Sequence, residues 1–306
     1  MINKTLQFMK IRRYAQLFSF LLLLLSIFSL SVNGLKLGLD FTGGTLVEVT
    51  YDQSVDLRLV RNTLEKSNFI NALVINYGSE KDILIRLPQS NTNTLGDEIL
   101  STLKKGYKGS IDLKRIEYVG PQIGEELREQ GGLGLLIALI SVMVYVAFRF
   151  QYKFSLGAVA ALIHDVIITL GIFSIFQWDF DLTVLAALLA VIGYSLNDTI
   201  VVSDRIRENF RILRKMKPID IINFSLTQTL GRTLITSATT LLVLLSLFIF
   251  GGEIIHGFAT ALIVGVIIGT YSSIFVAANI LLSLNLTKDD LIIPEPEASD
   301  HDSHML

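Results

Sequence analysis

The sequence contains no cysteine. This absence excludes a disulfide framework, a thiol nucleophile and a cysteine-ligated metal centre. Charge is also scarce: Asp, Glu, Lys and Arg make up 18% of 306 residues, and the formal net charge is −2. A nucleic-acid partner is therefore not expected from the charge of the whole chain. What the sequence has instead is apolar surface, since 51% of its residues are hydrophobic. This composition is typical of a membrane protein.

Six segments are long and apolar enough to span a bilayer, which takes about 20 residues in a helix. They are residues 14–33, 131–150, 154–176, 182–202, 232–250 and 257–283. The first could also be a signal peptide, but its apolar stretch is long and no small-residue cleavage site follows, so we expect a retained anchor. In the sixth, Gly257, Ala261, Gly265 and Gly269 recur every four residues and predict a close-packing face.

Lys and Arg alternate between the loops, which predicts the orientation. Residues 1–13 carry four basic residues and the segment 203–231 carries six, whereas the turns at 177–181 and 251–256 carry none. We therefore expect both termini in the cytoplasm and residues 34–130 outside it. The tail 284–306 is acidic over most of its length and contains two prolines, so we expect it to be disordered and cytoplasmic.

The external segment 34–130 alternates between strand and helix patterns. Strand patterns occupy residues 45–51, 72–78, 82–88 and 111–120, helical patterns occupy 55–67 and 92–106, and a tight turn is expected at 79–81. The order β-α-β-β-α-β predicts a small ferredoxin-like α+β domain between the first and second spans. Its open sheet face either binds extended chains or serves only to pack the domain.

Two glycine motifs flank this domain. GLDFTGG, which includes Gly38, Asp40, Gly43 and Gly44, joins the first span to the first strand. Gly120 and Pro121 precede the second span and fix the direction of the chain there. Each motif is interpreted either as a hinge or as a plain connector.

Four ionisable residues lie within apolar spans: His164, Asp165, Asp198 and Arg232. A carboxylate in hydrocarbon costs about 2.5–3.5 kcal/mol on insertion scales, so each such group is a candidate for function. At about 1.5 Å per helical residue, His164 and Asp165 are expected near mid-bilayer and Asp198 in its cytoplasmic third.

Arg232 is expected at the depth of Asp198 on the next helix, so we predict that the two residues pair. Helical spacing places Thr236 and Thr239 on the face of Arg232, while Ser195 and Asn197 accompany Asp198. Because a nearby Arg favours the ionised carboxylate and burial favours the neutral one, separation of the pair would load a proton. The alternatives are that Arg232 snorkels to headgroups, and that His164 and Asp165 brace neighbouring helices.

Several of these segments together resemble the SecF family of bacterial protein-export membrane proteins. They are GLDFTGG, VGP, LIHDVIITLGIF (162–173), SLNDTIVVSDRIREN (195–209) and RTLITSATTLLVLLSLFIFGG (232–252). The resemblance covers residues 10 to 285, with the motifs in the family's order.

The resemblance implies a multi-pass protein of the bacterial inner membrane that forms an obligate complex with SecD. It implies association with the SecYEG channel and YajC, and use of the proton motive force to promote late, SecA-independent steps of preprotein export. By motif, the family's intramembrane acid and arginine correspond to Asp198 and Arg232, and a partner acid is expected on SecD. The resemblance implies neither an enzyme nor a cofactor or metal; protons are the coupling ion.

Two other functions remain open from the sequence. One is a scaffold that stabilises the translocon without using energy, with Asp198 and Arg232 as a structural ion pair. The other is half of a proton-coupled small-molecule exporter, which would need a substrate pocket in the external domain.

Overall fold

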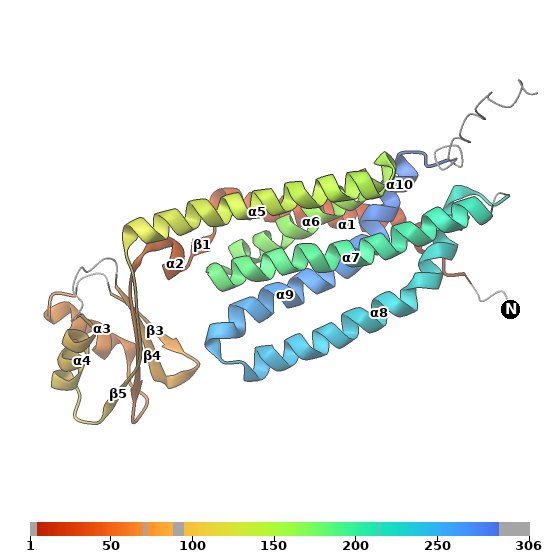
Figure 1. Cartoon of the computed structure of the whole chain (residues 1–306). Helices are drawn as coiled ribbons and strands as arrows, with labels where there is room; N and C mark the ends of the chain where they lie inside the picture. The colour runs from red at the N-terminus through yellow and green to blue at the C-terminus, as the bar shows by residue number, and fades with distance from the viewer. Residues whose placement is uncertain (1–4, 70–71, 88–94, 214, 288–306) are drawn as a thin grey trace, which may run out of the picture.

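The protein has two parts, a bundle of long helices and a small α+β domain at one end of it (Figure 1). The computed structural model describes residues 5–69, 72–87, 95–213 and 215–287. The first described residues and the last helix lie together at the end of the bundle away from the α+β domain. Six long helices, an even number, cross the bundle in the described residues, so the chain returns to the end at which it started.

Within the described residues, six helices are long and apolar enough to cross a membrane, as predicted. They are α1 (Arg12–Val32, preceded by the 3₁₀ turn η1, Phe8–Ile11), α5 (Pro121–Arg149), α6 (Tyr152–Phe176), α7 (Leu182–Ile212), α8 (Pro218–Phe250) and α9 (Glu253–Ser272). The last continues through a π-helical turn, η2 (Ser273–Ala277), into α10 (Ala278–Ser283).

The predicted loop 203–231 is largely helical instead, because α7 continues to Ile212 and α8 already begins at Pro218. The two helix ends pack together: the Asn209 amide donates to Ser225 Oγ at 2.9 Å and to Gln228 Oε1 at 2.8 Å. Buried polar pairing of this kind lets both helices extend beyond their apolar spans. Residues 288–306 of the predicted tail lie outside the described residues.

The α+β domain has the predicted ferredoxin-like order. It comprises β2 (Gly44–Tyr51), α3 (Leu57–Lys66), β3 (Leu73–Tyr77), β4 (Ser79–Leu87), α4 (Leu95–Gly106) and β5 (Ile111–Val119). The four strands form one antiparallel sheet in the order β3-β4-β2-β5. Both helices cover the sheet face that points away from the bundle (Figure 1), and Val47, Ile85 and Leu64 are fully buried between them. The opposite face points towards the bundle.

The turn between β3 and β4 is tighter than predicted. Tyr77 pairs directly with Ser79 around Gly78, whose φ is +77°, so residues 79–81 belong to β4 rather than to a turn. In β4 the Asp82 carboxylate accepts hydrogen bonds from Ser79 Oγ, at 2.6 Å, and from Thr50 Oγ1. These hydrogen bonds, from Ser79 first and then Thr50, hold the pKa of Asp82 below its ordinary value.

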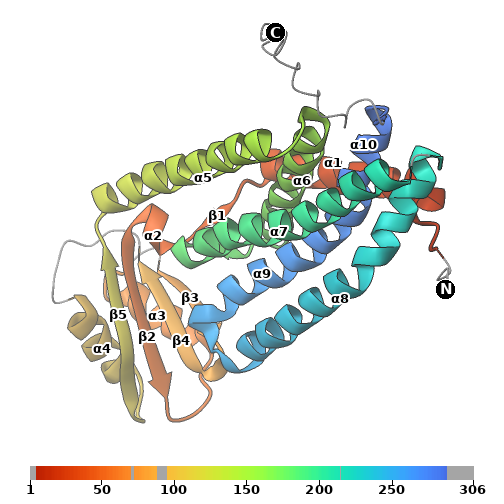
Figure 2. The same ribbon diagram turned by 45° about the vertical axis from the view of Figure 1, so that its right-hand side comes forward.

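Helices α6, α7 and α9 form the centre of the bundle, and α1, α5 and α8 lie around them (Figure 2). The predicted small-residue face of the sixth span packs on α7. A methyl group added at Gly265 would lie 2.1 Å from a Val191 methyl, and one at Gly269 would lie 3.0 Å from Ser195 Cβ. Glycine at these positions therefore brings α9 and α7 close together.

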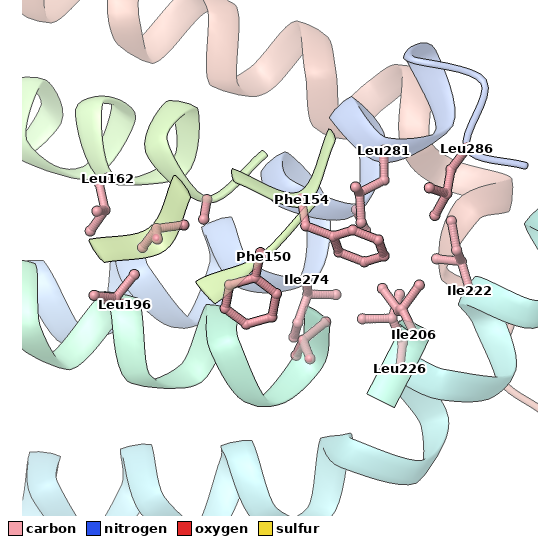
Figure 3. Close-up of a cluster of buried hydrophobic side chains, with 14 of the residues drawn as sticks. Phe150, Phe154, Leu162, Leu196, Ile206, Ile222, Leu226, Ile274, Leu281 and Leu286 are labelled. Carbon is pink, nitrogen blue, oxygen red and sulfur yellow. The ribbon is translucent and has the colours of Figure 1, made fainter. Parts of the chain in front are cut away.

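A cluster of buried apolar side chains holds the helix ends together away from the α+β domain (Figure 3). Phe150 and Phe154 from the α5–α6 turn meet Ile206 of α7, Leu226 of α8 and Leu281 of α10. Because this cluster contains side chains from seven of the chain's helical segments, it fixes their positions at this end of the bundle.

Candidate functional site

Asp198 lies in the middle of α7 with its side chain inside the bundle, where it is 8% exposed. Thr233 Oγ1 of α8 donates to Asp198 Oδ1 at 2.6 Å, and Ser273 Oγ of η2 donates to Asp198 Oδ2 at 2.6 Å. Two hydroxyls from two other helices thus replace water around this carboxylate. Hydrogen bonds to a charged acceptor are each worth about 1.5–3 kcal/mol, which offsets much of the cost of burial.

Ser273 has a second acceptor. Its hydroxyl oxygen also lies 3.0 Å from the backbone oxygen of Thr270, and one hydroxyl carries only one proton to donate. When Asp198 is ionised, Ser273 donates to it. When Asp198 is protonated, the acid can donate to Ser273, whose own proton then points to Thr270. Both protonation states of Asp198 therefore have satisfied hydrogen bonds.

The predicted direct pair of Asp198 and Arg232 is wrong in this conformation. The ion pairs found among the described residues do not include it, and Arg232 is exposed on the outer face of α8. One residue turns a helix by about 100°. Because Thr233 is the residue that contacts Asp198, its neighbour Arg232 points away.

The predicted polar stripe also lies on the outer face of α8. Thr236 and Thr239 are exposed and donate to backbone oxygens of their own helix, those of Arg232 at 3.0 Å and Ile235 at 2.9 Å. Asn197 is exposed as well, so it does not line the interior with Asp198. The prediction that this stripe faces the fourth span is therefore wrong.

The inner face of α8 carries Ser237 one turn after Thr233. Its hydroxyl lies 2.7 Å from Thr270 Oγ1 and accepts from the Tyr194 hydroxyl at 3.3 Å. Thr233 and Ser237 thus both join α8 to the centre of the bundle.

A second buried carboxylate, Asp165 of α6, lies beside α7 and α9. Its Oδ2 accepts from Ser195 Oγ at 2.5 Å and from Ser272 Oγ at 2.7 Å, and its Oδ1 lies 2.9 Å from His164 Nδ1. The side chain of Ser195, which we expected to support Asp198, therefore supports Asp165.

The two glycine motifs meet in space at the junction of the two parts. Gly43 and Gly44 have φ of +68° and +126°, which only glycine adopts readily. A methyl group at Gly43 would lie 2.9 Å from Pro121 Cα, and one at Gly44 would lie 2.6 Å from Leu87 O. Gly120 precedes α5 with ordinary backbone angles, and Pro121 occupies its first turn. The predicted hinge residues are therefore brought together.

The first glycine motif also contacts the start of α7. The short strand β1 (Lys36–Leu37) pairs in parallel with β6 (Asp179–Phe180), and a Lys36–Asp179 salt bridge of 2.8 Å borders it. In the short helix α2 (Leu39–Thr42), Asp40 Oδ2 accepts from the backbone N–H of Leu182 at 3.0 Å. Asp40 thus caps the helix that carries Asp198.

A cavity of about 690 Å³ lies between the open sheet face and the helix ends nearest the α+β domain. Leu46, Ile75 and Leu84 line it from the sheet, and Phe248 and Ile254 line it from α8 and α9. Arg86 and Arg115 add charge at the sheet side. Arg86 also donates to Thr42 and so ties the sheet to the glycine motif.

Among the described residues, no three His, Asp or Glu side chains gather as a metal site. The sequence reasoning missed Thr233, Ser272 and Ser273 as partners of the carboxylates. The signal for the serines was present, since two adjacent hydroxyl residues interrupt the apolar sixth span.

Comparison with known proteins agrees with this architecture. Residues 99–287 match the family described as protein export membrane protein SecD/SecF, C-terminal, and residues 28–55 match the SecD/SecF GG motif. The chain is 51% identical over 298 residues to the protein translocase subunit SecF of Vibrio alginolyticus, covering 96% of this chain and 95% of that protein. It is 45% identical over 304 residues to the SecF of Escherichia coli O157:H7, covering 98% and 94%.

Solved structures resemble the chain as well. The crystal structure of SecDF, a translocon-associated membrane protein from Thermus thermophilus, matches with a TM-score of 0.84 and 36% identity over 93% of this chain. The chain spans 39% of the length of that SecDF chain. A SecDF structure in a super-membrane-facing form matches with a TM-score of 0.69. This chain is a multi-pass membrane protein that belongs to the SecF family of protein-export membrane proteins.

Proposed function

We propose that this chain is the proton-carrying subunit of a membrane motor that promotes late, SecA-independent steps of protein export. The observation that carries the proposal is the Asp198 site. It is a buried carboxylate whose ionised and protonated forms both have hydrogen-bond partners, Thr233 and Ser273, on separate helices. The chain acts without a cofactor and without enzymatic chemistry on its substrate.

Protons supply the energy in this proposal. A charge that moves through the full membrane potential yields about 2.3 kcal/mol per 100 mV, which is enough to shift a two-state equilibrium more than tenfold. Protonation removes the charge that Thr233 and Ser273 stabilise, so the packing of α8 and η2 against α7 depends on the proton.

A mechanical path leads from Asp198 to the α+β domain. Asp198 and the Asp40 cap lie on the same rigid helix, and the β1–β6 pair ties the start of that helix to the segment entering the domain. A tilt of α7 would therefore move α2 and the glycine junction with it. The domain on the other side of the junction would amplify the tilt into a larger displacement.

The orientation follows from the basic residues. The end of the bundle opposite the α+β domain carries Arg205, Arg207 and Arg211, as the positive-inside rule requires of a cytoplasmic face. Both termini are then cytoplasmic and the α+β domain is periplasmic, in a bacterial inner membrane.

A second membrane subunit is needed for the outer face of α8. Arg232 lies on that face at the depth of Thr233, where lipid would be an unfavourable neighbour for its charge, and Thr236 and Thr239 continue the polar stripe along the helix. We propose that SecD covers this stripe and supplies an acid for Arg232. The solved relatives, whose chains are longer and are described as SecDF, are consistent with such a pairing. SecYEG, YajC and the preprotein itself complete the set of proposed partners.

The test replaces Asp198 by Asn in the chain co-expressed with SecD. Preprotein translocation into inverted membrane vesicles is measured with and without a proton motive force. We expect Asp198→Asn to lose the stimulation by the proton motive force while the complex still assembles. Asp204→Asn is the matched control, because Asp204 lies on the same helix but pairs at the surface with Arg149 at 3.2 Å. If Asp198→Asn retains full stimulation, the chain is a scaffold that uses no energy.

The cavity favours a second candidate function, half of a proton-coupled exporter of small apolar molecules. Its volume of about 690 Å³ falls within the range of small-molecule sites, and most of its lining is apolar. Ile75→Trp would fill it. If this variant blocked efflux of an apolar dye and left preprotein export unchanged, the exporter function would be favoured.

A further inference from the structure

Three consecutive residues, the last two of α9 and the first of η2, contact three ionisable side chains on two other helices. The Tyr271 ring stacks on the His164 ring with centroids 6.2 Å apart. Ser272 donates to Asp165 at 2.7 Å, and Ser273 donates to Asp198 at 2.6 Å. The π-helical turn η2 begins at Ser273, and such turns are frequent at functional sites. This segment therefore joins the two buried carboxylates.

The His164–Asp165 pair is more deeply buried than Asp198. Asp165 is fully buried and His164 is 3% exposed. The Nδ1 atom of His164 lies 2.9 Å from Asp165, but its Nε2 atom is buried without a hydrogen-bond partner among the described residues. A buried polar atom without a partner costs about 1–3 kcal/mol, so a brace between helices does not account for it. The atom is accounted for if Nε2 is a proton acceptor that becomes protonated in another state of the protein.

Asp165, like Asp198, has hydrogen-bond partners in both protonation states. Ser272 Oγ also lies 3.1 Å from the backbone oxygen of Gly269. Its proton is therefore donated to Asp165 when the acid is ionised and to Gly269 when the acid is protonated. Each of the two adjacent serines thus has a carboxylate and a backbone carbonyl as alternative acceptors.

We propose that the His164–Asp165 pair is a second proton-binding site, coupled to Asp198 through Ser272 and Ser273. The pair takes one proton from a hydronium ion, which leaves as water, and its net charge changes from −1 to 0. Protonation of one site favours ionisation of the other, because two like charges in a low-dielectric interior repel. The inference rests on the proposed function, since it assigns a second station to the same proton-driven cycle.

The other titratable groups facing the pair are few. Tyr271 faces it from α9 and Asp198 faces it from α7 across the serines. The helix α1 packs against α6 with no acidic or basic residue between Ala15 and Val32. The proton equilibrium of the pair therefore depends mainly on Asp198 and on the His164–Asp165 contact.

The test is pH-difference infrared spectroscopy of the full chain, co-expressed with SecD and reconstituted in lipid. The carboxyl C=O band reports a proton on the acid of the pair, and the imidazole ring bands report a proton on His164 Nε2. We expect a band that persists in Asp198→Asn and is lost in Asp165→Asn. We also expect His164→Phe to change the midpoint of this band, because the acid loses its hydrogen-bonded imidazole. Thr169→Val is the matched control on α6, since Thr169 donates to the backbone oxygen of Asp165 at 2.8 Å.

Three outcomes are decisive. If the difference spectrum of Asp165→Asn equals that of the wild type, the second site is overturned, even if Asp198→Asn abolishes proton-driven export. If His164→Phe leaves the midpoint unchanged, the coupling of the imidazole to the acid is overturned. If the Asp165 band is present but Asp198→Asn exports normally, the second proton site is supported and the proposed function fails.

Discussion

Gly265→Ala tests whether the close approach of α9 and α7 holds the proton site together. The new methyl group would lie 2.1 Å from Cγ2 and 2.9 Å from Cβ of Val191. Val191 Cγ1 would lie 2.6 Å from it. Ordinary carbon contacts begin at about 3.5 Å, so the helices must separate by about 0.9 Å if Val191 rotates and about 1.4 Å if it does not. If α9 and α7 separate by about 1 Å, the 2.6 Å hydrogen bond from Ser273 to Asp198 would lengthen to about 3.6 Å, beyond hydrogen-bond range.

The expected result has a stability part and an activity part. Overpacking of this kind costs about 1–3 kcal/mol, so the unfolding temperature of the reconstituted protein should fall. Export driven by the proton motive force should fall with it. The double variant with Val191→Ala should recover part of both, because the two clashing methyl groups are gone.

Gly132→Ala in α5 provides the control, since a methyl group there meets no atom of the chain within 4 Å. Alanine is a better helix former than glycine by about 0.5–1 kcal/mol, so this variant should be neutral or slightly more stable. A Gly265→Ala protein as stable and as active as Gly132→Ala would refute the packing argument.

Three further predictions follow from the structure. Asp40→Ala removes a cap of α7 and should lower the stability of that helix by about 0.5–2 kcal/mol. The loss should appear as faster hydrogen exchange at the first turn of α7, and unchanged exchange would contradict the capping role of Asp40. Thr233→Val should reduce export driven by the proton motive force, because ionised Asp198 loses a donor, whereas Thr236→Val should leave it unchanged; equal effects of the two variants on export would contradict the inward position of Thr233. The lowered pKa of Asp82 contributes stability that is present above its ordinary pKa of about 3.9 and is lost as the pH falls through the lowered value. Hydrogen exchange in β4 should therefore accelerate in strong acid, and Asp82→Asn should remove that pH dependence.

The sequence was sufficient for the elements whose patterns are local. Alternation around Val47 and Ile85 predicts strands with one buried face, and the apolar runs predict the six helices. The order of these elements then restricts the small domain to one common topology, because strand–helix–strand connections between parallel strands of one sheet are almost always right-handed.

The partners of Asp198 were harder to predict, because they depend on helix rotation. Thr233 and Arg232 differ by one position, or about 100°, and apolar spans with weak periodicity do not fix a rotation that precisely. We predicted that the more polar stripe of α8 faces the interior of the bundle. In the structure this stripe lies on the outer face of α8. A chain with a partner subunit has polar residues on two faces, and one sequence does not distinguish them. The contact between Asp40 and α7 joins residues 142 positions apart, so no local pattern reports it.

The most direct test of the account measures the position of the α+β domain against pH. Because the chain has no cysteine, spin labels can be placed uniquely at Leu59 of α3 and Ile254 of α9, both of which are exposed. The distance between the labels is recorded in the complex with SecD across the pH range in which Asp198 titrates. The account predicts a distance that shifts with pH in the wild type and does not shift in Asp198→Asn. The same shift in both proteins, or no shift in either, would contradict the claim that a proton on Asp198 moves this domain.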